Sequence, residues 1–127
     1  MELVSIFVFF LTGSNRNYVK FLYYGAEKNA MHDGIRIFNK VGDAYGFLID
    51  ACYFADYKNN IEFMLSGVIY CNSDGIFNDD KYDYDSVGFP FMKNLGQVIY
   101  QYELKRNKKV IPNLDKFNRS GNAGNQR

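Results

Sequence analysis

The first half of the chain contains three stretches in which side chains alternate with the two-residue period of a β-strand. In the first stretch Ile35 and Ile37 point to one face, while Phe38 and Lys40 point to the other. Short polar turns with glycine or asparagine separate the stretches, which favours antiparallel hairpins. We therefore expect an antiparallel sheet of at least three strands. The expected strands lie near 35–41, 46–56 and 61–71.

The second and third of these strands are apolar on both faces. In the second, Phe47 and Ile49 alternate with Leu48 and Cys52. An antiparallel sheet with one solvent-exposed face would instead alternate apolar and polar residues. Both faces should therefore need cover. If only one is covered, the chain should be marginally stable and should self-associate through the other.

A helix is expected over 89–106. Pro90 suits the first turn of a helix, and Lys105 and Arg106 suit its C-terminal end. An apolar stripe recurs at helical spacing. Its members are Met92, Leu95, Ile99 and Tyr102. The fold class is therefore α+β, with an antiparallel sheet and a C-terminal α-helix packed on one face.

The N-terminal part is less regular. Residues 3–11 form an apolar run that is too short to span a membrane, and Glu2 replaces the basic start of a signal peptide. This apolar run has three possible interpretations. It could be a buried strand or helix, a degenerate signal peptide, or the remnant of a longer protein that was truncated. Residues 18–25 are amphipathic and predict a short helix closed by Gly25. We divide the chain into an N-terminal segment (1–34), a sheet-and-helix unit (35–106) and a polar tail (107–127).

Composition narrows the classes of function. The 127 residues suit one domain, and a net charge of +1 argues against nucleic acid as a partner. Cys52 and Cys71 fall on neighbouring strands but not opposite each other, so two free, buried thiols are expected. His32 is the single histidine and reads as a solvated loop residue. The acidic loop 71–85 lacks the calcium-loop pattern. No metal or other cofactor is predicted.

One motif in the sequence indicates a chemical function. Lys-Val-Gly at 40–42 is followed by Tyr-Gly at 45–46 and by Asp-Ala at 50–51. This run resembles the Lys-Thr-Gly strand of the penicillin-recognising serine hydrolases, especially the class A β-lactamases. In that family Lys-Thr-Gly is followed by Tyr-Gly, and then by Asp and a small residue that open the next strand. The resemblance covers about 35–106, including the order of strand, strand and helix.

The resemblance implies a role for three positions. Lys40 would bind a substrate carboxylate through a charge-assisted hydrogen bond, and Gly42 would let substrate lie close to the strand. The backbone N–H of Asp43 would donate to a developing oxyanion. The implied fold is part of a β-lactamase-like α/β sandwich, and the implied ligand is a β-lactam or acyl-peptide. A missing helical domain would be the natural partner, and the family location would be the periplasm or cell envelope.

The sequence also departs from the family. Val41 replaces the threonine, so its hydroxyl donor is lost. No serine is followed three residues later by lysine, so the Ser-x-x-Lys nucleophile is missing and no catalytic residue is assigned. We therefore expect the C-terminal part of such a hydrolase, inactive alone, as a truncated product or half of a split protein. The alternative is a non-catalytic binding or structural α+β module.

Overall fold

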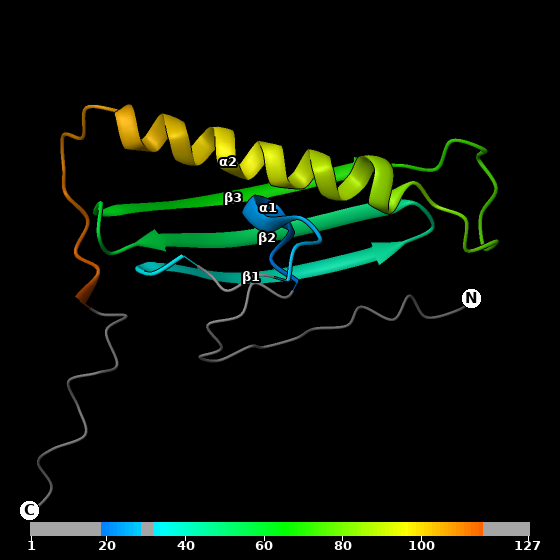
Figure 1. Ribbon diagram of the computed structural model, residues 1–127, viewed down its shortest axis with the longest axis horizontal. Coiled ribbons are helices and arrows are strands. Elements are labelled where there is room, and N and C mark those ends of the chain that lie inside the picture. Colours follow the sequence, from blue (N-terminus) through cyan, green and yellow to red (C-terminus); the bar gives the residue numbers. More distant parts are fainter. Residues whose placement is uncertain (1–18, 29–31, 116–127) are drawn as a thin grey trace, which may run out of the picture.

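The computed structural model describes residues 19–28 and 32–115, and within them the chain forms a sheet with helical segments on one side (Figure 1). The apolar run at 3–11 and most of the polar tail lie outside the described residues. The elements, in chain order, are α1 (Phe21–Tyr24), β1 (Ile35–Ala44), β2 (Phe47–Asp56), β3 (Ile61–Tyr70), the π-helical turn η1 (Tyr84–Gly88) and α2 (Phe89–Lys105). The predicted α+β class, with three antiparallel strands and a C-terminal helix that contacts the sheet, is confirmed.

The sheet has the strand order β1-β2-β3, and both pairings are antiparallel. Cys52 pairs with Leu65, which is the register expected from the sequence. Both cysteines are free and buried, as predicted. The first strand extends beyond its expected end near 41, because β1 continues through Ala44. Tyr45 and Gly46 make a two-residue turn with φ angles of 52° and 88°, the positive values that a tight hairpin requires.

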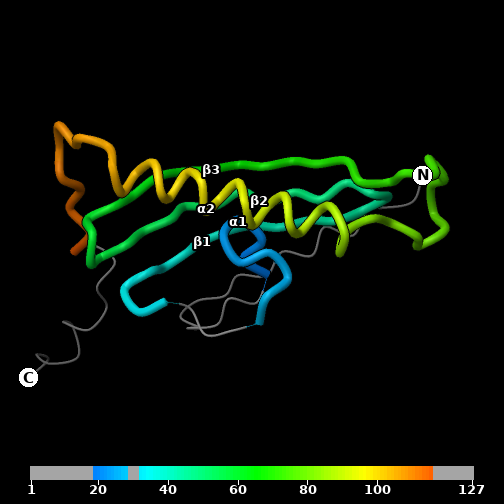
Figure 2. The backbone as a smooth tube through the Cα atoms, turned by 45° about the horizontal axis from the view of Figure 1, so that its top comes forward, coloured from blue at the N-terminus to red at the C-terminus, as the bar shows by residue number. Residues whose placement is uncertain are grey.

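The core lies on the side of the sheet that α1 and α2 cover (Figure 2). Leu48, Phe54 and Ile61 project from the strands and are almost completely buried. They meet Leu22 from α1 and Met92 from α2, which are equally buried. Burial of such side chains is the main stabilising contribution in a domain of this size. Helix α2 therefore contacts the sheet as predicted, but of the predicted stripe Met92 is buried and Tyr102 is exposed, while Gly96 and Tyr100 are buried instead.

The prediction of a short regular helix at 18–25 is wrong. Only four residues are assigned to α1, and two of them, Leu22 and Tyr23, have non-helical backbone angles. Tyr23 has a φ of 107°, which an L-residue rarely adopts. The segment is a compact turn held by its neighbours, because Gly96 of α2 packs directly against its backbone. Tertiary contacts have overridden the amphipathic pattern.

The opposite side of the sheet, called the open face below, is not covered by any described element (Figure 1). Large apolar side chains on this side are exposed by 42% or more. They are Phe38, Phe47, Ile49, Met64, Val68 and Tyr70. This uncovered surface was expected from the doubly apolar strands; marginal stability and self-association remain predictions.

Candidate functional site

The three residues singled out by sequence lie inside β1, not at a turn. Two hydrogen bonds at the strand ends show which way the backbone N–H and C=O groups point. Between β1 and β2, the Tyr57 N–H donates to the Gly34 carbonyl oxygen at 2.9 Å, and between β2 and β3, the Cys71 N–H donates to the Gly46 carbonyl oxygen at 2.7 Å. Backbone groups alternate in direction along an antiparallel strand. The even-numbered residues of β1 therefore bond to β2. The N–H groups of Val41 and Asp43 point to the outer edge of β1, which pairs with no other described strand.

Lys40 and Gly42 have their side-chain positions on the open face. Lys40 is exposed and lies opposite Ala51 in the register. A Cβ added at Gly42 would come within 3.2 Å of a methyl carbon of Ile49, so the Ile49 side chain lies against this glycine and would have to shift slightly to admit a larger residue. Ala44 continues the strip of small residues on this side of β1. In the described part of the chain, the edge of β1 thus combines an exposed lysine, small side chains and an outward N–H within four residues.

The η1 segment anchors the hairpin between β1 and β2 through hydrogen bonds. The Gly46 N–H donates to the hydroxyl oxygen of Tyr84 at 3.0 Å, and that hydroxyl donates to the carbonyl oxygen of Phe47 at 3.3 Å. The thiol of Cys71 also lies 3.3 Å from the Gly46 carbonyl oxygen. These contacts hold the turn on its β2 side, at Gly46 and Phe47. The end of β1 therefore has a fixed position relative to η1 and α2.

A buried polar cluster lies on the other face of β1, beneath Lys40. Asp50 is fully buried and accepts hydrogen bonds of 2.9 Å from the Leu22 N–H and from the Asn39 side-chain amide. The Lys20 ammonium donates to the Asn39 side-chain oxygen at 2.6 Å, and the Asn39 amide also reaches the Val19 carbonyl oxygen at 2.7 Å. Every polar group of this cluster serves to fasten α1 to the sheet.

Burial controls the titration of this cluster. It raises the pKa of Asp50 to about 6, although the Leu22 N–H, the Asn39 amide and Lys20 pull the value down. Burial also lowers the pKa of the Lys20 ammonium, and the Asp50 charge opposes that change. Cys52 lies nearby, and burial raises the pKa of its thiol to about 12. A thiol with so high a pKa is a poor nucleophile at neutral pH.

A second buried carboxylate ties α2 to the β2–β3 turn. Asp56 accepts a hydrogen bond of 2.6 Å from the Tyr100 hydroxyl and one of 2.7 Å from the Asn59 amide. Burial by itself raises the pKa of Asp56, but these bonds and the N–H groups of Lys58 and Asn59 outweigh it and lower the pKa. Each acceptor position has a partner within the fold, so Asp56 acts as a structural anchor.

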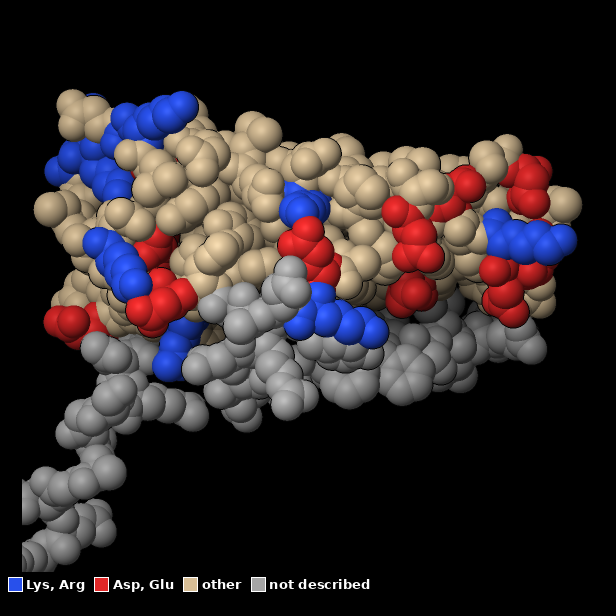
Figure 3. All heavy atoms as spheres, in the orientation of Figure 1, with Lys and Arg blue, Asp and Glu red and all other residues tan. Residues whose placement is uncertain are grey.

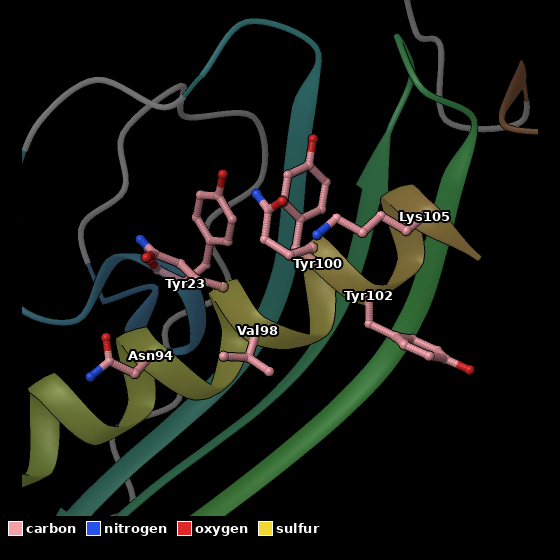
Figure 4. A pocket seen from close by; sticks show the side chains of 8 residues that line it. Tyr23, Asn94, Val98, Tyr100, Tyr102 and Lys105 are labelled. Atoms are coloured by element: carbon pink, nitrogen blue, oxygen red, sulfur yellow. The ribbon is translucent and has the colours of Figure 1, made fainter.

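A shallow groove runs along the outer side of α2 (Figure 4). Its floor is helix surface, and Gln97 closes one side by donating to the Tyr23 carbonyl oxygen at 3.2 Å. The lining mixes amide, aromatic and apolar side chains with a single cation. The residues are Tyr23, Asn94, Gln97, Val98, Tyr100, Gln101, Tyr102 and Lys105. The residues that line this groove include no serine, cysteine, histidine or carboxylate.

Charges are spread over the surface. Figure 3 shows acidic and basic side chains interspersed on this face, with a basic group at the end where α2 stops. Among residues 19–28 and 32–115, no group of histidine, cysteine and acidic side chains could hold a metal ion. In the same part of the chain, no helix is both long and apolar enough to cross a membrane.

Sequence reasoning missed the two buried carboxylate clusters. Lys20 and Asn39 are ordinary polar residues in the sequence, and their meeting with Asp50 depends on the irregular path of α1. The only sequence feature that could have indicated a buried role for Asp56 is its position at the end of an apolar strand. Comparison with models of known families, with curated proteins and with solved structures finds no match for this chain. The function must therefore be argued from the residues themselves.

Proposed function

We propose that the sheet-and-helix unit is the C-terminal portion of a β-lactamase-like serine hydrolase, and that β1 is its substrate-binding strand. In this proposal Lys40 binds the carboxylate of a β-lactam or acyl-peptide, and the Asp43 N–H donates to the carbonyl oxygen under attack. Gly42 and Ala44 leave room for the ligand to lie along the strand. The fold would form part of an α/β sandwich.

The outward direction of the Asp43 N–H is the observation that carries the proposal. An N–H that bonds to β2 cannot reach a ligand. Because the direction of the backbone groups alternates, the N–H of the next residue along the strand bonds to β2 and is excluded in this way. Oxyanion stabilisation needs a preorganised donor held on a rigid element. The register of β1 with β2 and the anchored Tyr45–Gly46 turn give the strand that rigidity.

Exposed Lys40 supports the same assignment. Its ammonium has no ion-pair partner among the salt bridges of the described residues, whereas Lys58 and Lys93 pair with Asp33 and Glu27. A solvated cation beside bare backbone can accept an anionic group without first breaking an internal contact. A charge-assisted hydrogen bond of this kind contributes about 1.5–3 kcal/mol.

Catalysis is not assigned to this chain. The sequence has no Ser-x-x-Lys, and without a nucleophile the covalent route of the family is closed. The open face is where further structure would have to bring such groups. We therefore infer binding without turnover: the unit supplies the strand that receives the substrate, and a helical domain would supply the nucleophile.

The proposal is tested with a chromogenic cephalosporin and a fluorescent penicillin on the purified chain. The expected result is no hydrolysis and no stable adduct. Turnover that Lys40→Ala abolishes but Lys109→Ala, at another exposed lysine, leaves unchanged would overturn the claim of inactivity. If no ligand of this class binds, the chain is a structural α+β module instead.

A further inference from the structure

Basic residues are concentrated in the C-terminal part of the sequence. Seven of the 15 Lys and Arg residues fall within the last 23 positions, where Asp115 is the single acid. The net charge of +1 therefore combines a strongly basic segment with an acidic remainder. Such an asymmetry of charge is typical of chains that meet an anionic surface.

The described part of this segment lies at one end of the sheet, beside the β2–β3 turn (Figure 1, Figure 2). After α2, the Lys108 ammonium donates to the carbonyl oxygens of Asn59 and Asn60 at 2.9 and 3.1 Å. Further along the segment, Leu114 is buried. The residues between these two contacts therefore form a loop that is fixed on both sides, called the 109–113 loop below.

The 109–113 loop holds two neighbouring apolar side chains out in solvent. Val110 is 80% exposed and Ile111 is 69% exposed. Neither belongs to the hydrophobic core of the described residues. The backbone bends at 109–110, and Pro112 favours an extended conformation at the residue before it. Val110 and Ile111 are therefore an apolar tip on an anchored loop.

Lysines flank this apolar tip. Lys105 and Lys109 are exposed, and Lys108 is half-buried. None of the three takes part in a salt bridge with another described residue, whereas Arg106 is paired with Glu103. On the face drawn in Figure 3, basic side chains gather at the end where α2 stops. This end of the domain thus combines positive charge with exposed apolar surface.

We propose that this end of the domain binds an anionic lipid bilayer, with Val110 and Ile111 entering the headgroup region and Lys105 and Lys109 meeting lipid phosphates. In peripheral binding of this kind, the burial of apolar area and the attraction of cations to anionic lipid add together. Each lysine near an anionic surface increases the affinity about five-fold. The basic residues at 116, 119 and 127 would strengthen the same attraction.

The aliphatic tip favours a lipid surface over nucleic acid. Both partners would attract the lysines of this segment. Proteins that bind single-stranded nucleic acid stack its bases on aromatic rings, however, and the 109–113 loop carries no aromatic residue. Aliphatic side chains beside cations are instead suited to the boundary between lipid headgroups and acyl chains.

Binding through the 109–113 loop would leave the end of β1 accessible. The loop lies at one end of the long axis of the sheet, and the β1–β2 turn lies at the other end (Figure 1). The domain would therefore stand end-on to the bilayer. Asp43, close to the β1–β2 turn, would point away from the lipid into water.

The opposite end of the domain provides a matched contrast. Ile76 and Phe77 are also adjacent and apolar, and they are exposed by 56% and 58%. Their loop, however, holds four aspartates and a single lysine, Lys81. Like charges would repel this end from an anionic surface. Charge therefore distinguishes the two exposed apolar pairs.

Vesicle flotation with the full chain tests the proposal. Binding is expected to vesicles of phosphatidylglycerol and phosphatidylcholine but not to phosphatidylcholine alone, and added salt should weaken it. Lys105→Gln with Lys109→Gln should lower the affinity about 25-fold, whereas Lys81→Gln should not lower it. Circular dichroism checks that each variant is folded. Equal binding to the two kinds of vesicle, binding to neither, or full binding of the double variant would overturn the proposal.

Tryptophan reporters distinguish insertion from attraction alone. Because the chain has no Trp, Ile111→Trp places a single reporter at the loop tip and Phe77→Trp places one at the opposite end. On addition of the anionic vesicles, the emission of Ile111→Trp should shift to the blue and be quenched by brominated lipid, while that of Phe77→Trp should not change. Soluble glycerol 3-phosphate should cause no shift.

Three results with the reporters would overturn the proposal. An equal shift with glycerol 3-phosphate would indicate a phosphate site instead of a bilayer contact. A shift with single-stranded DNA but not with vesicles would assign the basic segment to nucleic acid. An unchanged Ile111→Trp emission on vesicle binding would exclude insertion of the tip. The reporters lie outside β1, so a failure of ligand binding at Lys40 would leave these results unaffected.

Discussion

Asn39 donates a hydrogen bond of 2.9 Å to Asp50, directly behind the strand position that carries Lys40. Neighbouring residues of a strand point to opposite faces, so Asn39 is turned to α1 while Lys40 is turned to the open face. The inner side of β1 is therefore fixed by a buried polar cluster, and no described helix or strand covers its outer side. The stability of the fold and the proposed binding site share one strand but use different faces of it.

Replacing Asp50 by alanine should strongly destabilise the chain. The change removes the acceptor of the Leu22 N–H and one of the two acceptors of the Asn39 amide, and it removes the negative charge that favours the buried Lys20 ammonium. The expected loss is about 3–5 kcal/mol, a large part of the stability of a typical domain. Urea unfolding followed by circular dichroism measures it. Lys40→Ala, on the exposed face, is the control and should change stability by less than about 0.5 kcal/mol; equal effects would contradict the account.

The raised pKa of Asp50 predicts how stability depends on pH. Burial raises this pKa to about 6. A group whose pKa is higher in the folded state stabilises the fold below its unfolded value of about 3.9, and that contribution is lost as pH rises through the folded value. The Asp50 contribution should therefore fall by about 2 kcal/mol between pH 4 and pH 7. Unfolding at several pH values should show this fall in the wild type relative to Asp50→Asn, whose side chain does not titrate. An NMR titration that places the Asp50 pKa below 4 would refute the prediction.

Tyr100→Phe should weaken the attachment of α2 to the β2–β3 turn. The variant removes the 2.6 Å bond from the Tyr100 hydroxyl to the buried carboxylate of Asp56. A bond to a charged group contributes about 1.5–3 kcal/mol. The pKa of Asp56 is lowered by its hydrogen bonds, so its contribution is present above the unfolded pKa and is lost on acidification; in Tyr100→Phe that loss should begin at higher pH. Acid unfolding measures both effects, and Tyr102→Phe at an exposed position should leave the acid midpoint unchanged.

Gly96→Ala should destabilise the chain although alanine favours a helix. An added Cβ would lie 2.5 Å from the Tyr23 backbone nitrogen and 2.9 Å from the Leu22 carbonyl carbon. Backbone atoms cannot move away as a flexible side chain can, so α1 should be pushed off α2. The gain in helix propensity of up to about 1 kcal/mol is smaller than this clash. Thermal unfolding beside Gln101→Ala, on the exposed side of α2, tests it; a Gly96→Ala variant as stable as the wild type would show that α1 does not pack as described.

The sheet and the main helix were predictable because their patterns are local. Alternation along the strands fixes which side chains share a face, and Met92 of the apolar stripe lies on the covered side of α2, although Tyr102 at the other end of the stripe is exposed. The path of α1 was not predictable in this way. Its form depends on Gly96 and Asp50, which are distant in sequence and act on its backbone.

The candidate site was predictable in part. The motif at 40–43 marks the lysine, the glycine and the N–H. The sequence predicts a strand that ends near 41, but the turn consists of Tyr45 and Gly46 alone, so the whole motif lies inside β1. The direction of the Asp43 N–H depends on the parity of the hairpin register, which a change of one residue in the turn would reverse.

The most direct test of the account is an NMR titration of the ¹⁵N-labelled chain with benzylpenicillin. The proposal predicts that the Asp43 and Val41 amide signals shift first, with half-saturation at about millimolar concentration, because one charge-assisted bond and one N–H bond together supply only a few kcal/mol. Lys40→Ala and Gly42→Val should each weaken the response, the first by removing the cation and the second by filling the space beside it, while Lys109→Ala should not. Amide shifts at Asp43 that persist unchanged in Lys40→Ala, or no shift at any residue of β1, would contradict the proposal that this strand binds the substrate.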